Sequence, residues 1–170
     1  MRRFVLASTA VAALLLVPCA SAKTVRVNWR EQVVLDGERV MRLRVDALAF
    51  SADQWAVRLS FTNTSARLLT VIRNDFALAL YGPRARDACR FRVLRATTFW
   101  PGKPQRLDPG ETWRGVFGGR ATLPERGSLR IVVSRFSGGP QSFPRFGWLT
   151  DHVYDLGARR GRLAVAPTCR

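Results

Sequence analysis

The sequence is poor in the residues on which most catalytic and metal sites depend. Its 170 residues include one histidine, three cysteines and 12 aspartates or glutamates. A single histidine with well-separated cysteines does not make a zinc site, and the acidic residues lack the spacing of a calcium-binding loop. No G-x-S-x-G motif is present. We therefore expect no enzyme activity, no catalytic residues, no metal ion and no cofactor.

The one histidine, His152, has acidic neighbours in the sequence. Asp151 and Asp155 are close to it, and Asp155 would share its face if this segment were helical. General acid–base catalysis also needs a positioned nucleophile or substrate, and nothing in the sequence indicates one. We therefore interpret His152 as a structural or solvated residue.

Long apolar segments are also scarce, and the only one lies at the N-terminus. Residues 1–3 carry two arginines, and residues 4–17 are almost entirely apolar. Ala20 and Ala22 are the small residues that signal peptidase requires, so we predict a secretory signal peptide over residues 1–22. The apolar run is short for a membrane span, although a retained N-terminal anchor is the alternative.

Cys19 offers another way of processing the same segment. The residues before it resemble the recognition box of bacterial lipoproteins, but that box has a small residue where Pro18 stands. We expect soluble export, to the medium, the periplasm or the cell envelope, with a lipid anchor at Cys19 as the alternative. No later segment approaches the length of a membrane span, so none is expected after processing.

Acidic residues are outnumbered by basic ones. The chain has 28 lysines and arginines, and its formal net charge is +16. Only Lys23 and Lys103 are lysines. Compositional bias explains the preference for arginine over lysine, but it does not explain the shortage of acids. Since such a chain is attracted to anionic surfaces, the expected partner is an anionic cell-envelope polymer or an exported protein, rather than nucleic acid.

Removal of residues 1–22 would leave two cysteines, Cys89 and Cys169. An even count in an oxidising compartment predicts a disulfide between them, which would hold the C-terminal tail. Two free thiols are the alternative.

Helical periodicity is nearly absent, and alternation of apolar with polar residues dominates the chain. Turn residues such as Asp36-Gly37 and Asn74-Asp75 separate the alternating runs. This pattern predicts an all-β protein, an antiparallel immunoglobulin-like β-sandwich of about 7–9 strands over residues 23–137. The expected strands cover residues 25–29, 41–47, 55–62, 68–72, 76–81, 89–94, 112–117 and 128–136.

Residues 138–170 are richer in glycine, proline and aromatic residues. We predict a loop-rich C-terminal extension that packs on the same domain, with a short helix near residues 150–156 and a strand at residues 162–165. Long loops often carry binding surfaces, and arginines close to loop aromatics suit an anionic or protein partner. The alternative is that the aromatics cover the open end of the sandwich and the arginines are solvated. The candidate binding residues are Trp100, Arg145, Phe146, Trp148, Arg159, Arg160 and Arg162.

Two short motifs go beyond this general pattern. Residues 57–65 form a strand that runs into an Asn-Thr-Ser corner, and residues 107–113 contain a Pro-Gly turn followed by a strand. Together they resemble the immunoglobulin-like domains of exported bacterial proteins, including the DUF4352 type, and more distantly the BsuPI-type proteinase-inhibitor domain. The resemblance covers residues 40–136. It implies a non-enzymatic binding module, with a proteinase inhibitor or an assembly factor for exported proteins as the alternative, although the high positive charge departs from the inhibitor pattern.

Overall fold

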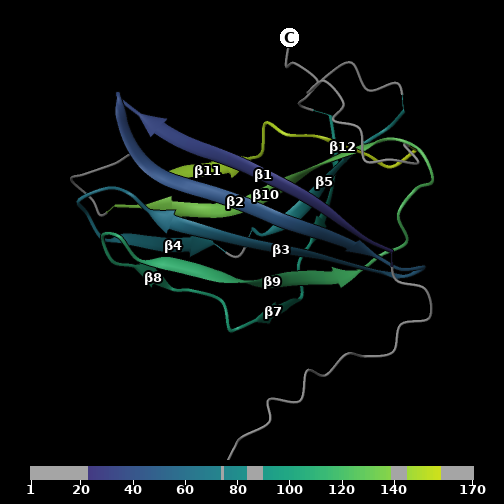
Figure 1. The fold of residues 1–170 in the computed structure, drawn as a ribbon, viewed down its shortest axis with the longest axis horizontal. Helices are drawn as coiled ribbons and strands as arrows, with labels where there is room; N and C mark the ends of the chain where they lie inside the picture. The colour runs from purple at the N-terminus through teal and green to yellow at the C-terminus, as the bar shows by residue number, and fades with distance from the viewer. Residues whose placement is uncertain (1–22, 74, 84–89, 139–144, 158–170) are drawn as a thin grey trace, which may run out of the picture.

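Two antiparallel β-sheets lie face to face in the computed structural model, which describes residues 23–73, 75–83, 90–138 and 145–157 (Figure 1). Sheet A has the strand order β1-β2-β3-β9-β7. Its strands are β1 (Lys23–Leu35), β2 (Glu38–Phe50), β3 (Gln54–Asn63), β9 (Thr112–Arg120) and β7 (Thr98–Trp100).

Sheet B follows the order β6-β5-β10-β4-β8, and β11 and β12 pair with its central strand β10. Its strands are β4 (Leu69–Arg73), β5 (Ala77–Tyr81), β6 (Arg92–Arg95), β8 (Arg106–Leu107), β10 (Ser128–Ser137), β11 (Phe146–Leu149) and β12 (Tyr154–Asp155). The described residues form no helix. The predicted all-β antiparallel sandwich is therefore confirmed.

A long hairpin builds the exposed part of sheet A. The predicted turn at Asp36-Gly37 is confirmed, because these residues have φ angles of 50° and 81° and a two-residue type I′ turn requires positive φ at both positions. The turn joins β1 and β2, which have 13 residues each. Strands of this length give sheet A a broad outer surface.

Alternate residues of both sheets meet in one hydrophobic core. In β3, Leu59 and Phe61 are fully buried, while Arg58 between successive inward residues is exposed. Phe61 contacts the ring of Phe136 from sheet B, with 5.8 Å between the ring centroids. Because side chains of a strand alternate between its two faces, the polar residues of the alternating runs must lie on the outer faces of the sandwich.

The structure has 12 strands in its described part, more than the 7–9 predicted. The additional strands are short: β7, β8, β11 and β12 have between two and four residues each. A strand of this length leaves too few residues for an alternating pattern to be detected.

The helix predicted near residues 150–156 is wrong. Thr150 is fully buried, its backbone N–H donates to the carbonyl of Ile131 at 2.9 Å, and its Oγ1 accepts from the backbone N–H of Ile131 at 2.9 Å. Tyr154 pairs with Leu129 of β10. The segment therefore satisfies its polar groups on a neighbouring strand, which competes with the internal hydrogen bonds of a helix.

Several predictions fall outside the described residues and stay predictions. They are the signal peptide with Ala20 and Ala22, the anchor at Cys19, the Cys89–Cys169 disulfide, the strand at residues 162–165, and Arg159, Arg160 and Arg162. In the part of the chain that the structure covers, no helix is both long and apolar enough to cross a membrane.

Candidate anion-binding face

A row of arginines crosses the outer face of sheet A. The register places Arg30 of β1 opposite Arg44 of β2, and Arg44 opposite Ser60 of β3. Ser60 is in turn opposite Arg114 of β9. All three arginines are exposed. Like charges directly opposite each other destabilise a sheet, so packing alone does not account for Arg30 beside Arg44.

A second row runs beside the first, two residues away along each strand. It consists of Gln32, Arg42, Thr62 and Thr112, on β1, β2, β3 and β9. The hydroxyl oxygens of Thr62 and Thr112 are 2.8 Å apart and form a hydrogen bond. The row therefore adds one more guanidinium group and a pair of hydroxyl groups to the same surface.

The two rows enclose a shallow hollow of about 360 Å³. No acidic residue lines it. Guanidinium groups are permanently charged and bind carboxylates or phosphates through paired hydrogen bonds, and hydroxyl groups donate to the same oxygens. The hollow thus offers hydrogen-bond donors and positive charge, and no carboxylate, to a ligand at its walls. Its lining residues are Arg30, Arg42, Leu43, Arg44, Ser60, Thr62, Thr112 and Arg114.

One acidic residue lies near these arginines. Asp46 occupies an irregularity in the pairing of β2 with β3, and its Oδ1 is 2.7 Å from Nε of Arg44. Within the described ranges, no acidic side chain pairs with Arg30, Arg42 or Arg114. Asp46 therefore compensates the charge of one of the four guanidinium groups, and the positive charge of the other three is available to a ligand.

A third row extends the surface to the edge of the sheet. Arg58 of β3 is opposite Val116 of β9, and Val116 is opposite Trp100 of β7. Trp100 is 75% exposed. Of the predicted binding residues that lie within the described ranges, Trp100 is therefore the one on the arginine-rich face.

Two other predicted binding residues, which were expected in loops, lie in a strand instead. Phe146 and Trp148 belong to β11 and are 7% exposed. The ring of Phe146 stacks on Phe136 with 5.4 Å between centroids, and Nε1 of Trp148 donates to Glu31 at 3.0 Å. Because β11 pairs with β10, its alternate side chains turn into the sandwich. Arg145, just before β11, is exposed next to sheet B.

The arginines of the hollow were not among the predicted site residues. The alternation in β2 marked Arg42 and Arg44 as outward-facing, and it did the same for the polar positions of β3. The sequence does not state which residues of β1, β3 and β9 stand beside them. Only the strand register brings Arg30 and Arg114 into the same row.

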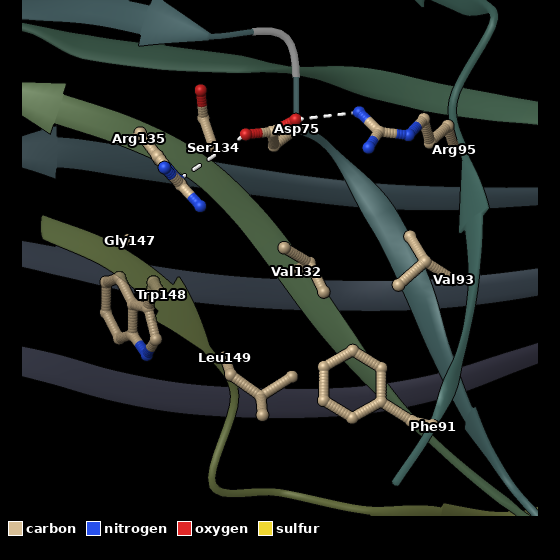
Figure 2. Close-up of a pocket in the computed structure, with 10 residues that line it drawn as sticks. All are labelled: Asp75, Phe91, Val93, Arg95, Val132, Ser134, Arg135, Gly147, Trp148 and Leu149. Atoms are coloured by element: carbon tan, nitrogen blue, oxygen red, sulfur yellow. Dashed lines mark hydrogen bonds and ion pairs between the residues drawn. The ribbon is translucent and has the colours of Figure 1, made fainter. Parts of the chain in front are cut away.

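A second hollow, of about 350 Å³, lies on the outer face of sheet B and has a different chemistry (Figure 2). Figure 2 shows Asp75 at one end, where its carboxylate is 2.8 Å from Arg95 and 3.6 Å from Arg135. The other end is apolar and includes Phe91 and Leu149. Since Asp75 pairs with both Arg95 and Arg135, this hollow lacks the unpaired arginines of sheet A.

No protein-family model matches this chain, and a search of the curated proteins finds none that is similar to it. The resemblance to immunoglobulin-like exported domains therefore stays a prediction based on two motifs. The function has to be argued from the residues of the arginine-rich face.

Proposed function

We propose that this protein is an exported, non-enzymatic binding module that holds an anionic cell-envelope polymer on the outer face of sheet A. The proposal depends on one observation: four arginines and three hydroxyl side chains line a hollow that contains no acidic residue. Guanidinium groups recognise carboxylate and phosphate oxygens by charge and by geometry. The net charge of +16 adds a long-range attraction to any polyanion.

The shape of the face favours a polymer over a small anion. A single exposed ion pair contributes little, because water and salt screen it. The arginine rows extend across β1, β2, β3 and β9, so a chain with repeated negative charges can contact several guanidinium groups at once. Each contact after the first is intramolecular and gains from the high effective concentration.

A pair of charge-matched variants tests this proposal. The face variant carries Arg30→Gln, Arg42→Gln and Arg114→Gln, all on the outer face of sheet A. Glutamine keeps most of the stem length and hydrogen-bonding capacity while it removes the charge. Binding of the full chain to isolated bacterial cell envelopes is then measured by sedimentation at low and at high salt.

The control variant carries Arg92→Gln, Arg106→Gln and Arg126→Gln, which are exposed and lie outside sheet A. Both variants lower the net charge by the same amount. We expect the face variant to lose on the order of tenfold or more in affinity, which corresponds to about 1.4 kcal/mol, and the control variant to lose much less. High salt should release the unchanged protein. Equal losses in the two variants, or binding that salt does not weaken, would contradict the proposal.

The same sedimentation experiment separates the polymer from a protein partner. A proteinase inhibitor or an assembly factor would bind an exported protein in a fixed stoichiometry, and digestion of envelope proteins would abolish that binding. We expect binding to survive digestion of the envelope proteins.

A further inference from the structure

Trp100 differs from every other tryptophan of the chain in its exposure. The chain has five tryptophans, and Trp100 is 75% exposed, whereas the remaining four are at most 8% exposed. Tryptophan is enriched at binding interfaces, and this exposed ring lies on the same face as the arginines, where it is available to a ligand. The four buried tryptophans are Trp29, Trp55, Trp113 and Trp148.

The outward direction of Trp100 is fixed by its strand. The preceding residue, Phe99, packs into the core, with its ring 5.4 Å from Phe76 and 6.2 Å from Phe117. Neighbouring side chains of a strand point to opposite faces, so Trp100 points away from the core. Strand β7 also lies tight against β9, because a Cβ atom at Gly115 would come within 2.5 Å of the carbonyl oxygen of Trp100.

The ring and the arginines are spaced for an extended ligand. Trp100 is three strands away from Arg44 in the order β2-β3-β9-β7, which corresponds to about 14 Å across the sheet. Arg114 lies between them, one strand away from Trp100 and two residues along β9 from Val116, the register partner of Trp100. A ligand that contacts both the ring and Arg44 must therefore span several units of a chain.

We infer that the polymer held by this face is a linear anionic glycan, with one sugar ring stacked on Trp100 and the charged groups of the following units among the arginines. This inference rests on the proposed function and specifies its ligand. A sugar ring has an apolar C–H face, which an aromatic ring covers, and hydroxyl groups at its edge. The hydroxyl groups of Ser60, Thr62 and Thr112 lie between the arginines and suit such an edge.

Other polyanions fit the face less well. Single-stranded nucleic acid is bound by several aromatic platforms, one for each of a series of bases. A lipid surface requires a continuous apolar patch. Among the described residues of sheet A, the exposed large hydrophobic side chains are Val34 and Trp100, and they belong to the opposite edge strands β1 and β7. A protein partner would contact aromatic anchors at the centre of an interface, whereas Trp100 lies at its margin.

The test compares two polymers that carry the same charged group. Polygalacturonate has carboxylates on a sugar chain, and poly-L-glutamate has them on a peptide chain. We expect the unchanged protein to bind polygalacturonate at least tenfold more tightly. Trp100→Ala should lose about tenfold in affinity for polygalacturonate and little for polyglutamate, and Trp100→Phe should retain most of the affinity because it keeps a ring.

Fluorescence provides a direct readout of the ring itself. Because Trp100 is the exposed tryptophan, acrylamide quenching reports mainly on this residue. Saturating polygalacturonate should protect it from acrylamide, and polyglutamate should not. Val93→Ala, which removes an exposed apolar side chain from sheet B, is the matched control and should leave both affinities unchanged.

The outcomes distinguish this inference from the proposed function. If Trp100→Ala binds polygalacturonate as tightly as the unchanged protein, or weakens both polymers equally, the glycan inference is wrong. The proposed function would then still hold if the face variant, which lacks Arg30, Arg42 and Arg114, binds both polymers more weakly than the unchanged protein. If the unchanged protein binds neither polymer, the glycan inference and the proposed function both fail.

Discussion

The carboxylate of Glu31 lies 2.7 Å from the imidazole Nδ1 of His152, which comes 121 residues later in the chain. The same oxygen of Glu31 accepts from the backbone N–H of His152 at 2.9 Å, and the other accepts from Nε1 of Trp148 at 3.0 Å. The imidazole also stacks on Trp29, with 5.4 Å between ring centroids. Glu31, on the edge strand β1, therefore ties sheet A to the segment that follows β11.

Glu31→Ala should destabilise the protein by about 2–4 kcal/mol, because it leaves the part-buried donors of His152 and Trp148 without their acceptor. Glu31→Gln should cost less, since an amide oxygen can accept some of these bonds. Urea unfolding at neutral pH measures both changes. Glu38→Ala is the control, because this exposed glutamate on β2 should contribute less than about 0.5 kcal/mol. Equal stabilities of the two alanine variants would show that Glu31 does not hold the sheets together.

Asn63 connects the two motifs on which the family resemblance is based. Its side chain is fully buried, Nδ2 donates to the carbonyls of Arg67 and Leu107 at 2.6 and 3.0 Å, and Oδ1 accepts from the N–H of Ser65 at 3.0 Å. Asn63→Ala should therefore destabilise the fold by about 3 kcal/mol. Thermal or urea unfolding checks this value, with the exposed Thr122→Ala as the control. A loss below about 1 kcal/mol would mean that the corner forms without the asparagine.

Arg30 and Arg44 provide a test in which stability and binding change in opposite directions. Their side chains are directly opposed across β1 and β2 and carry the same charge. Arg30→Gln should therefore raise the unfolding free energy by up to about 0.5 kcal/mol while it weakens binding to the anionic polymer. Arg92→Gln, on sheet B, should change neither quantity appreciably. If Arg30→Gln instead lowers the unfolding free energy, Arg30 and Arg44 do not repel each other in the folded protein. Their juxtaposition would then no longer indicate a ligand at this row.

The raised pKa values of the two tyrosines predict how the unfolding free energy changes at alkaline pH. Burial raises the pKa of Tyr81 above its ordinary value, with Arg130 opposing part of the effect. Burial also raises the pKa of Tyr154, and the neighbouring charge of Asp155 raises it further. Above about pH 10 the folded state then holds more protons than the unfolded state, so the unfolding free energy should fall as the pH rises.

Absorbance of tyrosinate at 295 nm measures this titration, because the chain contains no other tyrosines. The folded protein should ionise only above the range of free tyrosine, and Tyr154→Phe should reduce the alkaline loss of stability. Ionisation of both tyrosines near pH 10 in the folded protein would contradict this explanation.

The sequence predicted the long strands and their connections because their signals are local. The alternating runs over residues 41–47 and 55–62 lie within β2 and β3, and Asp36-Gly37 forms the turn between β1 and β2. The short strands β7 and β11 could not be predicted in this way. Each has only three or four residues and is defined by its pairing, β7 with β9 and β11 with β10, which no alternating pattern of that length announces.

The candidate site was predictable in composition but not in position. The excess of arginine indicated a basic surface. Trp100, which was expected in a loop, lies exposed in strand β7, and its role in binding stays a prediction. The row of Arg30, Arg44 and Arg114 depends on the register of strands β1, β2, β3 and β9. A shift of one residue would turn these side chains toward the core, and no local pattern specifies the pairing partner.

The most direct test of the arginine face is an NMR titration of the full chain with a short oligogalacturonate, in which the Nε–H resonance of each arginine is followed. Binding at this face predicts saturable shifts at Arg30, Arg42 and Arg114, which line the hollow of sheet A, and small shifts at Arg92 and Arg126. Shifts of similar size at all exposed arginines, or the largest shifts outside sheet A, would contradict it.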